Sequence, residues 1–328
     1  MELTWEEWKA MKKDLRRRFS GTGWTLLAYF IIMNAAVFLW MFVEVFWNML
    51  HLMLEQGPGG LIPQYFGSES GWGYFLAAGV GLLILLLWKK PCFFREQILA
   101  RGKPMTVGAF FGILCVFLGG QFLSQMVLSI SEIVLNLLGY TLLNGLEALS
   151  ADLDNFSMFL YAGVLAPITE EILFRGLIQR SLMPFGKRFA IFCSAFTFGI
   201  FHGNLIQAPF AFLVGLVLGY VAAEYNICWA MLLHMINNLV IADMLSRLTA
   251  SLPVMTANTV IWLILFAFSV AALVILIVRK KAIRTWKDSE PIYKTYLSCF
   301  FTSAGMVSFT AIMILMMGYS MYLMITPI

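Results

Sequence analysis

The chain has 328 residues, of which 61% are hydrophobic and only 12% are charged. An ordinary soluble domain carries roughly 25% charged residues, and it could not keep this much apolar surface in water. The composition therefore excludes a soluble globular protein and predicts one embedded in the lipid bilayer. The net charge of +4 does not indicate a nucleic-acid partner, because the basic residues lie between apolar runs.

Nine apolar runs reach or approach the roughly 20 residues that a spanning helix needs. We therefore predict an all-α polytopic membrane protein, a bundle of about eight to nine transmembrane helices with a polar site inside the membrane. Two runs are short for full spans and are expected to be tilted, extended or partly re-entrant; these are the fifth and the sixth. The nine runs are 24–43, 72–88, 106–126, 156–177, 189–202, 209–223, 229–245, 259–278 and 300–324.

The first twenty residues differ from the rest of the chain. Trp5, Trp8, Leu15 and Phe19 recur near helical spacing, with lysines and arginines between them. This pattern fits a basic amphipathic helix in the inner headgroup region, and it equally fits a basic tail that only sets the topology. We treat 1–20 as this N-terminal segment and 21–328 as a single transmembrane helical domain.

The basic residues indicate the orientation of the bundle. If the N-terminus lies inside, all of the 22 lysines and arginines except Arg247 fall on inner segments. Acidic residues such as Glu55, Glu147 and Asp152 then fall on outer segments without basic neighbours. Because positively charged loops stay on the cytoplasmic side, we predict a multi-pass protein of the cell membrane with a cytoplasmic N-terminus.

The fourth apolar run contains the polar motif EEILFR, which begins at Glu170. On a helix, Glu171 and Arg175 lie four residues apart on one face and can form an ion pair. Glu170 is rotated by about 100°, so it is the free carboxylate. A poorly solvated carboxylate can act as a general base toward water. Alternatively, both glutamates mark a helix end at the inner interface, where charges are tolerated.

Two histidines lie in later runs. His202 follows Phe198 by four residues on the same helix face, beside Gly203. His234 lies within an apolar run and shares a face with Asn238, so both can donate hydrogen bonds to one substrate atom. Each observation also has a structural explanation: a helix cap for His202, and hydrogen bonds between helices for His234 and Asn238.

Together these polar groups provide what peptide hydrolysis requires, a base for water and donors for an oxyanion. The candidate catalytic residues are Glu170, His202, His234 and Asn238. At a rise of about 1.5 Å per residue, His202 lies nearer the outer end of its run than the others. A tilted or offset helix is therefore needed to bring it level with them.

A metal-dependent mechanism fits the same residues. One glutamate and two histidines match a catalytic zinc site with an open position, so Glu170, His202 and His234 are candidate ligands. The HExxH pattern that would favour zinc is absent, and the choice between zinc and a metal-free glutamate stays open. The cysteines lack a CxxC spacing and are predicted to be free thiols: Cys92, Cys115, Cys193, Cys228 and Cys299.

At these residues the chain resembles the CPBP family of intramembrane proteases, which includes the CAAX prenyl endopeptidases and bacteriocin-processing and immunity relatives. The family pattern is EExxxR, then FxxxH, then HxxxN or HxxxD, on successive membrane helices. The resemblance covers a protease-like core at about 156–245. It is carried by Glu170, Glu171, Arg175, Phe198, His202, His234 and Asn238.

The resemblance implies a role for each motif residue. Glu170 and His202 would activate the attacking water, and His234 and Asn238 would stabilise the oxyanion. Glu171 and Arg175 would hold the site together. The implied substrate is a membrane-associated protein or peptide, prenylated or not.

Two other functions are compatible with parts of the pattern. A non-catalytic immunity or scaffold protein would keep the fold, although such a protein would be free to lose motif residues that are all intact here. In a transporter, buried charges would relay protons or ions. Against a transporter, no pair of Gly- or Pro-broken spans shows twofold repetition.

Overall fold

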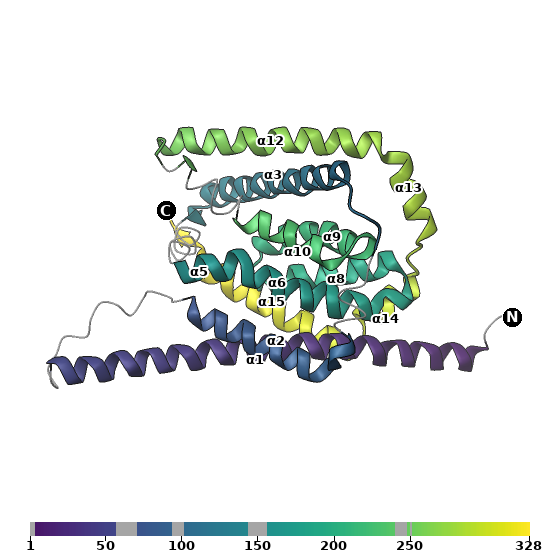
Figure 1. The fold of residues 1–328 in the computed structure, drawn as a ribbon, viewed down its shortest axis with the longest axis horizontal. Helices are drawn as coiled ribbons and strands as arrows, with labels where there is room; N and C mark the ends of the chain where they lie inside the picture. The colour runs from purple at the N-terminus through teal and green to yellow at the C-terminus, as the bar shows by residue number, and fades with distance from the viewer. Residues whose placement is uncertain (1–3, 57–70, 94–101, 144–155, 240–247, 250) are drawn as a thin grey trace.

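The computed structural model describes residues 4–56, 71–93, 102–143, 156–239, 248–249 and 251–328 (Figure 1). Its α-helices are α1 (Trp5–Gln56), α2 (Trp72–Phe93), α3 (Val107–Leu137), α5 (Phe156–Leu160), α6 (Ala166–Glu171), α7 (Arg180–Leu182), α8 (Lys187–Phe201), α9 (Gln207–Glu224), α10 (Ile227–Ile236), α12 (Val254–Val278), α13 (Lys280–Ser289), α14 (Lys294–Phe301) and α15 (Ala304–Met324). The helical stretch that contains the fourth predicted run also has segments of other winding. These are two π-helical segments, η3 (Tyr161–Leu165) and η4 (Ile172–Gln179), and one 3₁₀ turn, η5 (Met183–Phe185).

The protein is an all-α polytopic membrane protein, as predicted. Within the described residues, six helical stretches are long and apolar enough to cross a membrane: Trp5–His51, Val107–Leu137, Phe156–Phe185, Gln207–Glu224, Met255–Val278 and Ala304–Met324. Two shorter apolar helices, Trp72–Leu85 and Ile227–Leu239, accompany them. The predicted run at 189–202 forms α8, which has 15 residues.

Several predicted boundaries were wrong. The first run is part of a helix of 52 residues, α1, which begins at Trp5. The run at 300–324 is broken, because α14 ends at Phe301 and α15 begins at Ala304. Ser303, the residue before α15, has an extended backbone conformation, and its hydroxyl donates to Phe300 O. In the run at 229–245, residues 240–245 lie outside the described part of the chain.

The elements that carry the motifs lie in the middle of the bundle (Figure 1). The stretch from α5 to η4 packs with α8, α9 and α10, while α3 and α12 pair with one another on one side. On the other side, α1 pairs with α2 and α15. This arrangement separates the polar residues from the outer faces of the bundle.

Two apolar clusters hold the central helices. The first joins α1, η4, α8, α14 and α15 around aromatic side chains that are almost fully buried, among them Phe19, Phe174, Phe189 and Phe300. The second joins α3, α9 and α10 through Phe117, Leu118, Val214, Leu218 and Leu233. In a membrane, helices associate mainly through close packing of this kind. The motif helices are therefore fixed from both sides.

The N-terminal segment is continuous with the first span. α1 runs through residue 20 without a break, and its Leu15 and Phe19 side chains are buried in the first apolar cluster. The basic start of α1 and the basic helix α13 lie at the same end of the bundle (Figure 1). The positive-inside assignment requires this, but which face of the membrane they occupy stays a prediction.

A short antiparallel strand pair ties the C-terminus to the end of α3. β1 (Tyr140–Thr141) pairs with β2 (Thr326–Pro327). The carboxylate of Glu132 accepts hydrogen bonds from the Thr141 hydroxyl and, at 2.9 Å, from the Leu142 N–H. These contacts lie away from the motif residues and fix the orientation of α3 relative to α15.

Candidate active site

The first motif lies where the helix changes its winding. In η3 the Ala166 N–H donates to Tyr161 O, five residues back. The next donor in this register would be residue 167, but Pro167 has no N–H. The Ala162 carbonyl is therefore open to a side chain, and Asn238 Nδ2 donates to it at 2.8 Å. Such π-helical turns are often found at functional sites.

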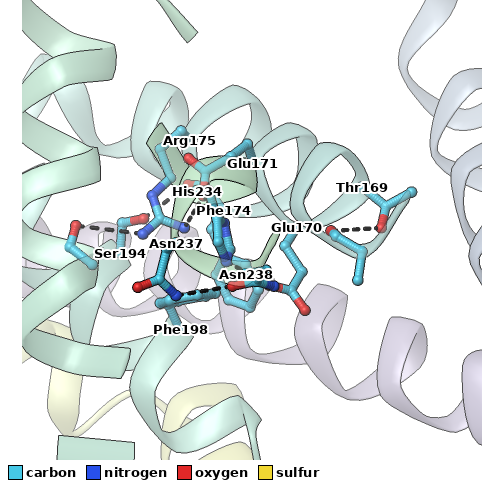
Figure 2. Close-up of polar contacts among 12 residues, drawn as sticks. Thr169, Glu170, Glu171, Phe174, Arg175, Ser194, Phe198, His234, Asn237 and Asn238 are labelled. Carbon is cyan, nitrogen blue, oxygen red and sulfur yellow. Dashed lines mark hydrogen bonds and ion pairs between the residues drawn. The ribbon is translucent and has the colours of Figure 1, made fainter. Parts of the chain in front are cut away.

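Glu171 and Arg175 form the predicted ion pair. Oε1 of Glu171 lies 3.1 Å from Nη1 of Arg175, and both side chains are fully buried. The same oxygen lies 3.0 Å from Nδ1 of His234, which comes from α10 (Figure 2). Glu171 therefore binds two cationic or potentially cationic groups. This second contact was not predicted.

Two glycines on α9 let the side chains of Arg175 and Gln179 reach backbone carbonyl groups of that helix. Arg175 Nη2 donates to Gly215 O at 3.4 Å, and Gln179 Nε2 donates to Gly219 O at 2.9 Å. A Cβ atom at Gly215 would lie 3.1 Å from the backbone of Ala195 on α8, and one at Gly219 would lie 2.8 Å from Gln179 Oε1. Small residues at this spacing allow helices to approach closely.

Glu170 points away from the ion pair, as its rotation on the helix predicts. Its side chain is 28% exposed, whereas that of Glu171 is fully buried. Oε2 of Glu170 lies 3.7 Å from Nε2 of His234. The two carboxylates thus face the two ring nitrogens of one imidazole. Of the two, only Glu170 has an exposed part.

His202 is brought toward the site by Phe198. The Phe198 ring lies 4.9 Å from the ring of His202 and 5.7 Å from that of His234, edge-on to both. The Arg175 guanidinium lies 4.3 Å from the centre of the same ring. Among the described residues, no hydrogen bond or ion pair joins His202 to Glu170. The Phe198 ring therefore lies beside both imidazoles and links His202 to His234.

The hydrogen bonds of the two histidines specify which nitrogen carries a proton. His202 Nδ1 lies 2.9 Å from Phe198 O, and a carbonyl oxygen can only accept. Nδ1 therefore carries the proton, and Nε2 of the neutral ring keeps a lone pair. By the same reasoning His234 Nδ1 donates to the carboxylate of Glu171. In both rings Nε2 is the nitrogen left for chemistry.

Asn238 is held by two residues that the sequence motifs did not include. Asn237 Nδ2 donates to Asn238 Oδ1 at 2.9 Å (Figure 2), and Gln121 Nε2 on α3 donates to Asn237 Oδ1. Asn237 stands next to the motif position, and Gln121 is an amide within an apolar run. A polar residue inside a membrane span is itself a signal of function, and it would have identified Gln121.

The arrangement of the donor groups decides whether a zinc ion fits the site. Among the described residues, no group of three or more His, Cys, Asp and Glu side chains has the arrangement of a metal site. Glu170, His202 and His234 thus do not fit a three-ligand zinc site in this conformation. Metal dependence stays a prediction.

Comparison with known proteins supports the resemblance seen in the motifs. Residues 152–240 match the model of the family described as Type II CAAX prenyl endopeptidase Rce1-like. The matched segment contains every motif residue from Glu170 to Asn238, and it confirms the predicted resemblance over this part of the chain. No curated protein and no solved structure matches the chain.

Proposed function

We propose that this relative of the type II CAAX prenyl endopeptidases is an intramembrane endopeptidase that hydrolyses a peptide bond of a membrane-associated protein or peptide. The observation that carries the proposal is the approach of Glu170 Oε2 to His234 Nε2, 3.7 Å apart within an apolar bundle. Titratable groups that face each other in a poorly solvated place are typical of acid–base catalysis. The partial exposure of Glu170 leaves room for the water that such a reaction consumes.

In the proposed reaction Glu170 takes a proton from water, and the water oxygen attacks the carbonyl carbon of the scissile bond. The electron pair of the carbonyl moves to its oxygen, which gives a tetrahedral oxyanion. The protonated Glu170 then gives its proton to the leaving nitrogen, and the C–N bond breaks. His202 assists through Nε2, whose lone pair accepts a hydrogen bond from the attacking water.

His234 and Asn238 stabilise the oxyanion in this mechanism. Asn238 Nδ2 has two N–H groups, and the bond to Ala162 O uses one of them. His234 donates through Nε2–H in its imidazolium form, because Nδ1–H is directed to Glu171. The Glu171 carboxylate stabilises that cation. Loss of one preorganised donor of this kind typically lowers kcat by roughly 10²–10³-fold.

The surroundings of the site support the substrate class. The motif helices lie inside the bundle, so the substrate must itself reach the membrane. The family description names prenylated CAAX substrates, and a lipidated C-terminal peptide is the first candidate for this chain. Localisation to the cell membrane with a cytoplasmic N-terminus is part of the proposal and is supported by the distribution of basic residues.

The test compares membranes from cells that carry the wild-type chain, Glu170→Gln or Glu44→Gln, the last being a control glutamate on α1. Mass spectrometry maps the N- and C-termini of all membrane proteins. We expect termini that appear with the wild type and with the control but are absent with Glu170→Gln, at equal amounts of folded protein. If no terminus depends on Glu170, the protease function is refuted, and a non-catalytic scaffold remains.

A second arm uses purified protein in vesicles and an internally quenched peptide that ends in a CAAX sequence, with or without a farnesyl group on its cysteine. Cleavage of the farnesylated peptide alone assigns a prenylated substrate. Equal cleavage of both peptides shows that the site does not recognise the prenyl group.

A further inference from the structure

A chain of hydrogen bonds joins three helices behind the motif residues. Gln121 Nε2 on α3 donates to Asn237 Oδ1 at 2.5 Å, and Asn237 Nδ2 donates to Asn238 Oδ1 at 2.9 Å. Asn238 Nδ2 then donates to Ala162 O in η3 at 2.8 Å. Asn237 is buried, and the other two amides are half-buried. In an apolar bundle each of these polar groups needs its partner.

In this hydrogen-bond relay from Gln121 to Ala162, the direction of donation is fixed at the Ala162 end. The Ala162 carbonyl can only accept, so Asn238 must turn its Nδ2 toward it and its Oδ1 toward Asn237. Asn237 must therefore donate to Asn238, which leaves its own Oδ1 facing Gln121. The residue at position 121 must then be a donor. An amide meets this requirement, whereas an ionised carboxylate of the same shape does not.

We propose that Gln121 is a positioning residue: through Asn237 it fixes the orientation of the Asn238 amide, so that nitrogen and not oxygen is presented to the oxyanion. This inference rests on the proposed protease function. Gln121 lies outside the segment that matches the family, so α3 contributes to the site without carrying a motif. α3 packs against α9, which in turn packs against α10, and Phe117 and Leu118 of α3 belong to the same buried cluster as Leu233 of α10.

The decisive variant is Gln121→Glu. It keeps the shape of the side chain and makes the hydrogen bond donated to Asn237 depend on pH. A protonated carboxyl group can donate to Asn237 Oδ1, and an ionised one cannot. We expect the ratio of its kcat to the wild-type kcat to be highest at low pH and to fall as the introduced carboxyl group ionises. Gln121→Leu should lower kcat by about 10-fold at every pH, less than the loss of an oxyanion donor itself, with KM within twofold of the wild type.

The matched control is Gln125→Glu, one turn further along α3, for which we expect a flat ratio near one. Cleavage of the farnesylated peptide between pH 5 and 9 gives these profiles, at equal melting temperatures of the compared proteins. A flat profile for Gln121→Glu, or an unchanged kcat for Gln121→Leu, overturns the proposal.

A readout without substrate separates this inference from the protease function. In nanodiscs with ¹⁵N-labelled asparagine, the side-chain N–H signals of Asn238 should shift in Gln121→Leu. In Gln121→Glu they should return toward the wild-type position as the pH falls. They should not move in Gln125→Glu. If the wild type cleaves nothing while these shifts occur, the relay stands and the protease function fails. If Asn238 is unaffected by Gln121→Leu, the relay itself is refuted.

Discussion

Glu171 is hydrogen-bonded to His234: Oε1 of the buried carboxylate lies 3.0 Å from Nδ1 of an imidazole 63 residues further along the chain. The same oxygen also contacts Arg175. One carboxylate thus links the helix of the first motif to that of the last. The orientation of His234, and with it the position of Nε2 opposite Glu170, depends on Glu171.

Loss of the Glu171 carboxylate should lower both the stability of the protein and its cleavage activity. In Glu171→Leu the Arg175 guanidinium is left buried without its counter-ion, which should lower the free energy of unfolding by about 3–5 kcal/mol. Cleavage should also be lost, because His234 Nδ1 no longer has an acceptor. Thermal unfolding in nanodiscs and cleavage at a temperature where the variant is folded measure the two effects.

The double variant Glu171→Leu/Arg175→Met distinguishes stability from orientation. Replacing both members of a buried ion pair by apolar residues is often nearly neutral, so its melting temperature should return toward that of the wild type. Cleavage should stay absent. A double variant that regains both stability and cleavage would show that Glu171 has no role in orienting His234.

Phe198 offers a test of the spacing between the two histidines. Its ring contacts both imidazoles and lies under the Arg175 guanidinium. Phe198→Leu should lower the free energy of unfolding by about 1–2 kcal/mol, from imperfect packing and the lost cation–π contact. Cleavage per folded molecule should also fall, because His202 is no longer held beside His234. A loss of stability alone would leave cleavage per folded molecule unchanged.

Phe189→Leu is the matched control, since Phe189 is also buried on α8, but within the described residues its ring contacts Phe19 and Phe300 and no motif side chain. We expect a similar fall in melting temperature and unchanged cleavage per folded molecule. Equal cleavage by both variants would show that the Phe198 ring is only a packing residue.

Local spacing predicted those parts of the site that lie on one helix. The i,i+4 relationship placed Arg175 beside Glu171 and turned Glu170 away, and it also placed Phe198 against His202. Contacts between helices could not be read in this way. The bond between Glu171 and His234 depends on how α6 and α10 pack, and no periodicity in the sequence contains that information.

The fold shows the same division. Each of the six long apolar helices in the described part of the chain overlaps one of the nine predicted runs, because apolar length is a direct requirement of the bilayer. The runs did not predict the break between α14 and α15, since a short polar interruption at Thr302 and Ser303 does not end an apolar run. Nor did they predict the hydrogen bond between Gln121 and Asn237: the position of Gln121 in a span marks it as unusual, but its partner depends on how the helices pack.

Pro167 provides the last prediction, because its missing N–H leaves the Ala162 carbonyl open to Asn238. Pro167→Ala introduces an N–H that competes for this acceptor, so Asn238 should lose its anchor and cleavage should fall. The free energy of unfolding should stay unchanged or rise by up to about 3 kcal/mol, since proline is unfavourable within a helix.

Pro209→Ala is the control. Pro209 lies in the first turn of α9, where backbone N–H groups have no helical partner, so neither cleavage nor the free energy of unfolding should change much. Full cleavage by Pro167→Ala would mean that Asn238 is held in place by Asn237 and Gln121 alone.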